Sequence, residues 1–265
     1  MIHNTAIIDK NANVHSNSEV GAYCIIGPQV RIGEGCYIHP HVVIDGNTEI
    51  KENCVIFPFS AIGTPAQDLH LPKDFKGNVH ISKNVTIREQ VTIHASTKSE
   101  DVTFIDENCF LMATSHIAHD CKIGKNVIMA NSSMLAGHVQ IGKNVFISGG
   151  AAIHQFARVG DFAFVIACSR TVQDIPPFCM TAGTSPTEFA GLNVVGLRRA
   201  GFTQEERNII KRAYKVLYKT GIKTTDSLKE LESKASHQLE KDIITFVQSA
   251  ERGIIRAWQG RKSSL

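Results

Sequence analysis

The stretch Ile26-Gly-Pro-Gln-Val-Arg-Ile32-Gly-Glu-Gly-Cys-Tyr-Ile38 places an isoleucine at every sixth position. The same spacing extends outward from it, so that aliphatic residues hold the anchor position through 8–62, 81–93 and 105–165. A period of six differs from the 3.6 of an amphipathic helix and the 2 of a half-buried strand. It is the repeat of a parallel β-helix, in which three hexads form one triangular coil.

A second inward position follows four residues after each anchor and holds small or β-branched residues. Five of the seven cysteines occupy it: Cys24, Cys36, Cys54, Cys109 and Cys121. We interpret these thiols as small core residues and not as metal ligands or redox groups. An odd number of cysteines without a visible secretory signal favours a reduced, cytoplasmic setting.

The hexads also define the domain organisation. Twenty-four of them predict eight coils, stacked at roughly 4.8 Å per coil, over residues 1–189. The breaks at 64–78 and 95–101 predict two loops that leave the prism. After Pro176-Pro177 the repeat ends, and 190–265 is predicted to be a small helical domain, with a capping box at Thr203-Gln-Glu-Glu206.

The composition excludes several classes of protein. A net charge of +3 and one tryptophan do not favour nucleic-acid binding. No apolar run approaches the roughly eighteen residues that a membrane-spanning helix needs, so no membrane insertion is expected. The balance of 43% hydrophobic and 20% charged residues is that of an ordinary globular chain.

Among the twelve histidines, the stretch His116-Ile-Ala-His119-Asp120 stands out. Steps of eighteen residues place His119, Gly137 and Gln155 in one vertical row, with Asp120 below His138 in the next row and His154 beside Gln155. Three histidines, an amide and a glycine therefore converge on one edge of the prism. Six other histidines are expected to be surface residues without chemical partners: His3, His15, His39, His41, His80 and His237.

This cluster suits acyl transfer. A neutral imidazole at position 119 can take a proton from a hydroxyl near neutral pH, and Asp120 can fix its tautomer. Gly137 can expose a backbone N–H where an oxyanion forms. Two other classes stay open: a zinc enzyme like the gamma-class carbonic anhydrases, and a trimeric scaffold without catalytic activity. The zinc pattern includes histidines five residues apart, whereas His116 and His119 are three apart, so no metal is expected.

Four segments match a known family in order and spacing: His116-Ile-Ala-His119-Asp120, Leu135-Ala-Gly-His138-Val139, Ile153-His-Gln-Phe156 and Gln173-Asp-Ile-Pro-Pro177. The chain resembles, over essentially its whole length, the UDP-N-acetylglucosamine acyltransferases, which begin lipid A biosynthesis. The resemblance implies an all-β fold with a small α part, namely a left-handed parallel β-helix followed by a C-terminal helical domain. It also implies a homotrimer whose sites lie between subunits.

The resemblance further implies a role for each matching residue. His119 corresponds to the general base, Asp120 to its orienting partner and Gly137 to the oxyanion-hole amide. The implied substrate-binding residues are Asp68, His70, His116, His138, His154, Gln155, Asn193, Arg198 and Arg199, with Ala167 as the position that measures acyl-chain length. The implied substrates are UDP-N-acetylglucosamine and a 3-hydroxyacyl chain on the phosphopantetheine of acyl carrier protein, without a further cofactor.

Three positions depart from the family pattern: His70 replaces a lysine, Val195 a glutamate and Ala200 an arginine. All three belong to the nucleotide-sugar side of the implied site. A sugar nucleotide with a 3-amino group, which would give an amide instead of an ester, therefore stays open as the acceptor.

Overall fold

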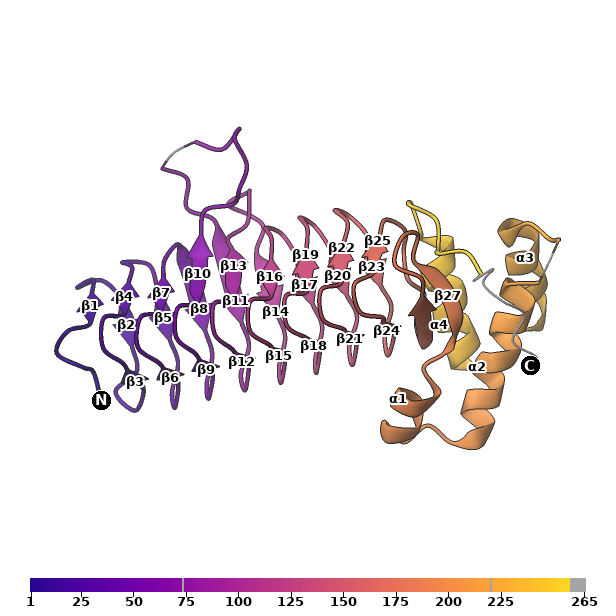
Figure 1. Cartoon of the computed structure of the whole chain (residues 1–265), viewed down its shortest axis with the longest axis horizontal. Helices are drawn as coiled ribbons and strands as arrows, with labels where there is room; N and C mark the ends of the chain where they lie inside the picture. The colour runs from indigo at the N-terminus through magenta and orange to yellow at the C-terminus, as the bar shows by residue number, and fades with distance from the viewer. Residues whose placement is uncertain (73, 220, 258–265) are drawn as a thin grey trace.

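The computed structural model describes residues 1–72, 74–219 and 221–257, and these form a long prism of stacked coils followed by helices (Figure 1). Each coil contributes one short strand to each of three sheets, and neighbouring coils pair in parallel, apart from the antiparallel pair β26–β27 at the end. The hexad repeat therefore predicted the architecture correctly.

The first sheet has nine strands. They are β1 (Ile7–Ile8), β4 (Ile25–Ile26), β7 (Val43–Ile44), β10 (Ala61–Thr64), β13 (Thr92–His94), β16 (His116–Ile117), β19 (Met134–Leu135), β22 (Ala152–Ile153) and β25 (Arg170–Thr171). The eight-stranded sheet contains β2 (Asn13–Val14), β5 (Arg31–Ile32), β8 (Asn47–Ile50), β11 (Asn78–Ile81), β14 (Thr103–Ile105), β17 (Lys122–Ile123), β20 (Gln140–Ile141) and β23 (Arg158–Val159).

The third sheet has ten strands. They are β3 (Glu19–Val20), β6 (Tyr37–Ile38), β9 (Val55–Ile56), β12 (Thr86–Ile87), β15 (Phe110–Leu111), β18 (Ile128–Met129), β21 (Phe146–Ile147), β24 (Phe164–Val165), β26 (Cys179–Ala182) and β27 (Glu188–Leu192). The expected domain boundary at residue 190 thus falls inside β27, which pairs with the last coil strand and belongs to the prism by its hydrogen bonds.

The anchors form the core. Stacked isoleucines such as Ile93 and Ile117 lie in register and are fully buried, and each fully buried side chain of this kind contributes roughly 1.5–3 kcal/mol. The five cysteines of the second inward position are buried as predicted, each with an unpaired thiol. The register fixes the height of every residue on the outside of the prism.

Two loops leave the prism where the hexads break. The first connects β10 to β11 and the second connects β13 to β14, and both leave from the edge where the nine-stranded and eight-stranded sheets meet. The first loop rises as a large excursion in Figure 1. Both loops therefore stand beside the edge that carries His119.

The helical domain contains α1 (Val194–Arg199), α2 (Gln204–Leu217), α3 (Thr224–Lys234) and α4 (Gln238–Gln248). The predicted capping box is present, because Thr203 and Glu206 bond to one another's backbone N–H groups at the start of α2. The short α1 was not predicted. No helix within the described part of the chain is long and apolar enough to cross a membrane.

Four histidines expected to lack partners make ring-stacking, carboxylate or helix-capping contacts, and the first of them, His39, stacks on Phe57 at 4.4 Å. His80 lies 2.9 Å from a carboxylate oxygen of Glu49 and stacks on Phe104. His237 caps the start of α4. His41 stacks between Tyr23 and Phe59, whose turns lie one coil above and one below. The expectation of isolated surface residues was wrong for these, because stacking brings together groups that are distant in sequence.

Candidate active site

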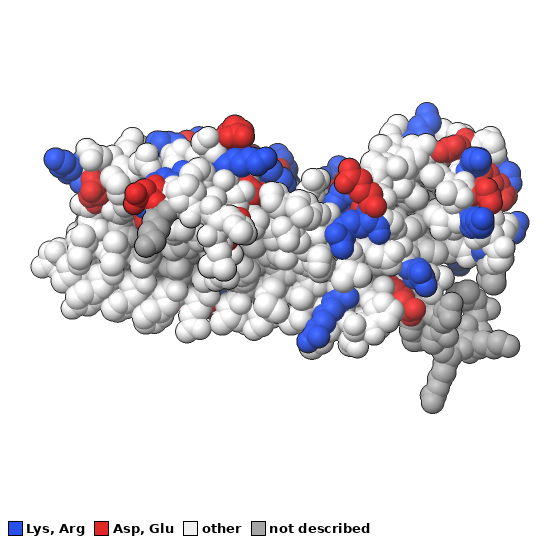
Figure 2. All heavy atoms as spheres, turned by 90° about the horizontal axis from the view of Figure 1, so that it is seen from above, with Lys and Arg blue, Asp and Glu red and all other residues white. Residues whose placement is uncertain are grey.

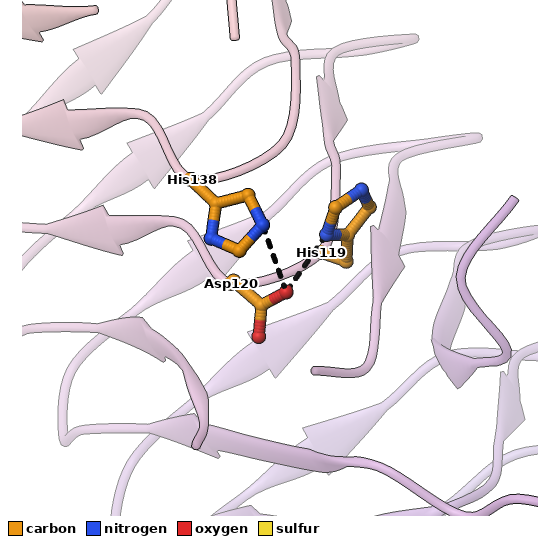
Figure 3. Close-up of side chains that lie close together, drawn as sticks. All are labelled: His119, Asp120 and His138. Carbon is orange, nitrogen blue, oxygen red and sulfur yellow. Dashed lines mark hydrogen bonds and ion pairs between the residues drawn. The ribbon is translucent and has the colours of Figure 1, made fainter. Parts of the chain in front are cut away.

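His119 and Asp120 form a hydrogen-bonded pair at the edge between the nine-stranded and eight-stranded sheets. The Nδ1 atom of His119 lies 2.8 Å from Oδ2 of Asp120, and the carboxylate is only 4% exposed. Figure 3 shows His119 and His138 approaching the same carboxylate oxygen from two sides. The proximity predicted from the eighteen-residue step is therefore present.

The second loop supplies the other partners of Asp120. The backbone N–H of Thr97 donates to Oδ1 at 3.1 Å, and the Thr97 hydroxyl donates to Oδ2 at 2.7 Å. Burial by itself raises the pKa of the Asp120 carboxyl, but the hydrogen bonds from Thr97 and His119 outweigh it and hold that pKa below its ordinary value. Asp120 is therefore ionised at neutral pH.

His138 completes the cluster. Its Nε2 lies 3.6 Å from Oδ2 of Asp120, and its ring meets the ring of His119 edge-on at 5.1 Å. The ring also stacks on Phe156 one coil further along. Stacking and the carboxylate together fix the orientation of this imidazole.

Gly137 lies directly against the His119 ring. A Cβ atom at this position would come within 2.4 Å of Cε1 and 2.5 Å of Nε2 of His119, so only glycine leaves room for the imidazole. Its carbonyl accepts from Phe156, whereas its N–H has no acceptor among the described residues. The structure thus gives a second reason for glycine, besides the exposed N–H that the sequence predicted.

Two hollows meet at His119. The first, which we call the inner groove, has a volume of about 350 Å³ and is lined by Gln67, His94, His116, Ala118, His119, Met134, Leu135, Ala136, Gly137, Ala152 and Ile153. The second, the outer hollow, has a volume of about 420 Å³ and is lined by Gln67, Asp68, Leu69, His70, Thr97, His119, His138 and Gln155. The structure therefore brings Asp68, His70, His116, His138 and Gln155 together around one imidazole.

His94 is a site residue that sequence reasoning missed. It lines the inner groove, is 6% exposed and meets the ring of His116 edge-on at 4.8 Å. Its Nδ1 has no hydrogen-bond partner within the described chain. Burial, with smaller contributions from His116 and His119, lowers the pKa of His94 to about 4, so the ring is neutral at pH 7. Burial also lowers the pKa of His116, whose Nδ1 lies 2.7 Å from the Thr92 hydroxyl.

Other predicted residues lie elsewhere on the molecule. Asn193 and Arg199 line a hollow of about 520 Å³ at the edge between the eight-stranded and ten-stranded sheets, together with Val195 and Ala200. The Asn193 side chain accepts from the N–H of Gly196 and donates to the carbonyl of Phe162, so it caps α1. Arg198 is exposed on the same helix.

Ala167 and His154 are also outside the cluster. Ala167 is exposed in the turn between β24 and β25, at the third edge of the prism. His154 is exposed and its Nδ1 lies 3.1 Å from the carbonyl of Gln155. It lines neither the inner groove nor the outer hollow. The predicted site residues of one chain are thus distributed over three edges.

The cluster also offers possible metal ligands. One ligand atom each from His119, Asp120 and His138 lie within 4.8 Å of one another. Oδ2 of Asp120 already accepts from Thr97 and His119, an arrangement that suits a hydrogen-bonded base and its partner. That no metal is needed stays a prediction.

A further hollow lies apart from this site. It has a volume of about 750 Å³ and lies between the eight-stranded sheet and α4, where Arg158, Asp242 and Phe246 contribute to its lining. None of the predicted site residues lines it.

Comparisons with known proteins identify the family of this chain. A family model described as bacterial transferase hexapeptide (six repeats) matches residues 29–64 and 103–137. A second model, described as domain 2 of UDP N-acetylglucosamine O-acyltransferase, matches residues 174–255. The repeats and the imidazole–carboxylate pair define a hexapeptide-repeat acyltransferase.

The relatives make the assignment more specific. The acyl-[acyl-carrier-protein]–UDP-N-acetylglucosamine O-acyltransferase of Thermodesulfovibrio yellowstonii is 46% identical over 96% of this chain and 99% of its own. The Francisella novicida UDP-N-acetylglucosamine acyltransferase structure has a TM-score of 0.94 at 35% identity, covering 98% of this chain and 95% of its own. The Campylobacter jejuni structure has a TM-score of 0.90 at 34% identity, covering 98% and 100%. The chain belongs to the UDP-N-acetylglucosamine O-acyltransferase family, and its fold is the left-handed parallel β-helix that the resemblance implied.

Burial of neutral His94 predicts acid-sensitive stability. The folded-state pKa of about 4 lies below the ordinary value of 6.5, so the unfolded chain binds the proton more tightly. The contribution of neutral His94 to the free energy of unfolding is fully present above about pH 6.5 and is lost as the pH falls toward 4. It amounts to about 3 kcal/mol. His94→Phe should therefore lose less stability than the wild type between pH 6.5 and 4.

Urea denaturation at fixed protein concentration measures this difference. His15→Gln, at an exposed position, serves as the control and should retain the wild-type pH dependence. Equal pH dependence of the wild type and His94→Phe would contradict the assignment of a neutral buried imidazole.

Proposed function

We propose that this chain transfers a 3-hydroxyacyl group from acyl carrier protein to the 3-hydroxyl of UDP-N-acetylglucosamine. The observation that carries the proposal is one imidazole, paired with a buried carboxylate, that lies where an apolar groove and a polar hollow meet. An acyl chain fits the chemistry of the first and a sugar that of the second. The names of the relatives support both substrates.

The geometry supports the following steps of the reaction. Because Nδ1 of His119 faces Asp120, its proton stays there and Nε2 is free to take the proton of the sugar hydroxyl. The alkoxide oxygen attacks the thioester carbonyl, and the N–H of Gly137 stabilises the resulting oxyanion. Collapse breaks the carbon–sulfur bond, and the proton on Nε2 passes to the leaving thiolate.

The inner groove supports the proposal that acyl-chain length is selected at Ala167. From His116 the outward ladder of the nine-stranded sheet continues through Met134 and Ala152 to Arg170. Three coil steps of roughly 4.8 Å span about 14 Å along this face. Ala167 lies beside the far end of the ladder, in the turn that leads into β25. A chain that follows the groove would therefore meet Ala167 with its terminal carbons.

The uncharged flank of the prism supports a homotrimer. Ile7, Ile25, Val43 and Ala61 form the outward ladder of the N-terminal half of the nine-stranded sheet, and Ile7 and Ile25 are exposed. Figure 2 shows one long flank of the prism that is almost free of charged residues, beside another flank that carries many of them. Apolar patches of this kind mark association surfaces.

Association also explains the separated site residues. In the proposed homotrimer, copies that pack side by side would place the Asn193 edge of one subunit toward the His119 edge of its neighbour, and nucleotide and sugar contacts would then come from two chains. We place the reaction in the cytoplasm, where the unpaired thiols stay reduced.

The alternatives are less well supported. The relatives are printed as O-acyltransferases, which favours a hydroxyl over a 3-amino acceptor. A scaffold without catalytic activity would not need a buried carboxylate that is hydrogen-bonded to an imidazole and a loop. Membership of the acyltransferase family does not favour a carbonic anhydrase.

Loss of the base should remove nearly all turnover. His119→Ala is expected to lower kcat by about 10²–10⁴-fold while the protein stays folded, because the ring lies on the outside of the prism and no core volume is lost. Transfer is measured with acyl carrier protein thioester and UDP-N-acetylglucosamine. A folded variant with wild-type turnover would defeat the assignment of His119.

Turnover should not depend on a metal. Asp120 and His119 satisfy one another by hydrogen bonding, and the thiols of the second inward position are buried in the core. Dialysis against a chelator is expected to leave kcat unchanged. Lost activity that zinc restores would overturn this prediction.

Ala167→Met should shift the donor preference toward shorter chains. Each buried methylene contributes about 0.8 kcal/mol, which discriminates roughly fourfold between neighbouring lengths. Competition between donors of different length, on the wild type and the variant, gives the ranking. An unchanged ranking with uniformly lower activity would mean that Ala167 only packs against a neighbouring subunit.

A further inference from the structure

The second loop, between β13 and β14, interrupts the hexad repeat. Hydrogen bonds to its backbone and side chains hold it in place. The Ser96 hydroxyl accepts from the N–H of Asn78 and lies within hydrogen-bonding distance of the carbonyls of Lys98 and Asp101. The Asn78 amide donates to the carbonyls of Ser99 and Asp101. These bonds anchor both ends of the loop to β11, so Thr97 between them has a defined position.

Thr97 contacts both oxygens of the Asp120 carboxylate. The N–H bonds to Oδ1 and the hydroxyl to Oδ2, and Oδ2 is the oxygen that faces Nδ1 of His119. Rotation of the carboxylate about its terminal bond would break at least one of these contacts. Thr97 therefore holds the plane of the Asp120 carboxylate in a fixed orientation relative to the His119 ring.

The carboxylate needs these donors. A buried ionised group without enough hydrogen bonds is costly and shifts toward its neutral form. His119 offers one donor to Asp120, and Thr97 offers two. The backbone N–H of Asp120 also donates to the hydroxyl of Thr103, the first residue of β14. This bond fixes the backbone of Asp120 beside the end of the second loop.

We propose that Thr97 is a positioning residue for the acyl transfer, acting through Asp120 on the tautomer and orientation of His119. The inference rests on the proposed function, because it assigns His119 as the base. The hydroxyl keeps Oδ2 aimed at Nδ1, so that Nε2 remains unprotonated toward the sugar hydroxyl. On this proposal, the role of the loop between β13 and β14 is to place the hydroxyl and the N–H of Thr97 at the buried Asp120 carboxylate.

Steady-state kinetics of Thr97→Val and Thr97→Ser test the proposal. Valine keeps the shape and the backbone N–H but removes the hydroxyl, so kcat should fall roughly 10- to 100-fold, the range for one lost hydrogen bond to a charged group. The KM for the acyl carrier protein thioester should stay within about twofold, since the lost bond is made to a group of the enzyme and Thr97 lines only the outer hollow, on the sugar side. Serine restores the hydroxyl and should restore kcat.

Ser99→Ala is the matched control in the same loop. The Ser99 hydroxyl is exposed and bonds only to Glu100 among the described residues, so kcat should be unchanged. Thr97→Val made in an Asp120→Ala background should cost less than about threefold further, because residues that act through one another are not additive. A full additional loss in that background would overturn the proposal.

The remaining outcomes are also decisive. A wild type without acyl transfer would refute the proposed function, whereas an active wild type with an unaffected Thr97→Val would refute only the role of Thr97. The thermal unfolding of Thr97→Ala is measured together with that of Thr97→Val and Thr97→Ser. Loss of the fold in both variants, with Thr97→Ser folded, would make Thr97 a structural residue and overturn the proposal.

Discussion

The vertical register between coils is the constraint on which the rest of this molecule depends. Each inward aliphatic side chain lies on its equivalent in the next coil, as Ile117 lies on Ile93 and below Leu135. A slip by one residue would turn the core outward. Because this register is fixed by burial, residues on the outer edges stack at a constant height, and an active site can be assembled from single positions in successive coils.

The site is costly in one respect, since it buries a carboxylate. The structure compensates with donors from two places, the neighbouring imidazole and a loop that leaves the prism. The result is an ionised Asp120 beside a histidine whose second nitrogen is free. The neutral His94 and the apolar face of Met134 then make one side of this imidazole suitable for an acyl chain, while the loop residues Asp68 and His70 make the other side polar.

The three-sided prism carries the predicted site residues on three different edges. His119, Asn193 and Ala167 therefore cannot act on one substrate position within a single subunit. In the homotrimer proposed above, flat faces would pack side by side and bring different edges of neighbouring subunits together. The uncharged ladder headed by Ile7 is consistent with such packing.

Much of this could be predicted from the sequence, for a physical reason. The hexads report burial at every sixth residue, and burial fixes the coils, the loops at 64–78 and 95–101, and the stacking of His119 with Gly137. The capping box at Thr203 likewise marks α2 by local bonds. The six-residue α1 has no comparable signal, since its cap depends on Asn193 reaching the carbonyl of Phe162 in another coil.

The tertiary structure alone decided the residues that the loops bring in. Thr92 stacks on His116, 24 residues later in the chain, because the second loop lengthens that coil, so steps of eighteen do not lead to His94. Thr97 belongs to no hexad at all, and nothing in its neighbourhood marks it as a partner of Asp120. Sequence periodicity determined what lies in the repeat, whereas contacts across the interruptions depend on how the loops fold back, which only the assembled chain fixes.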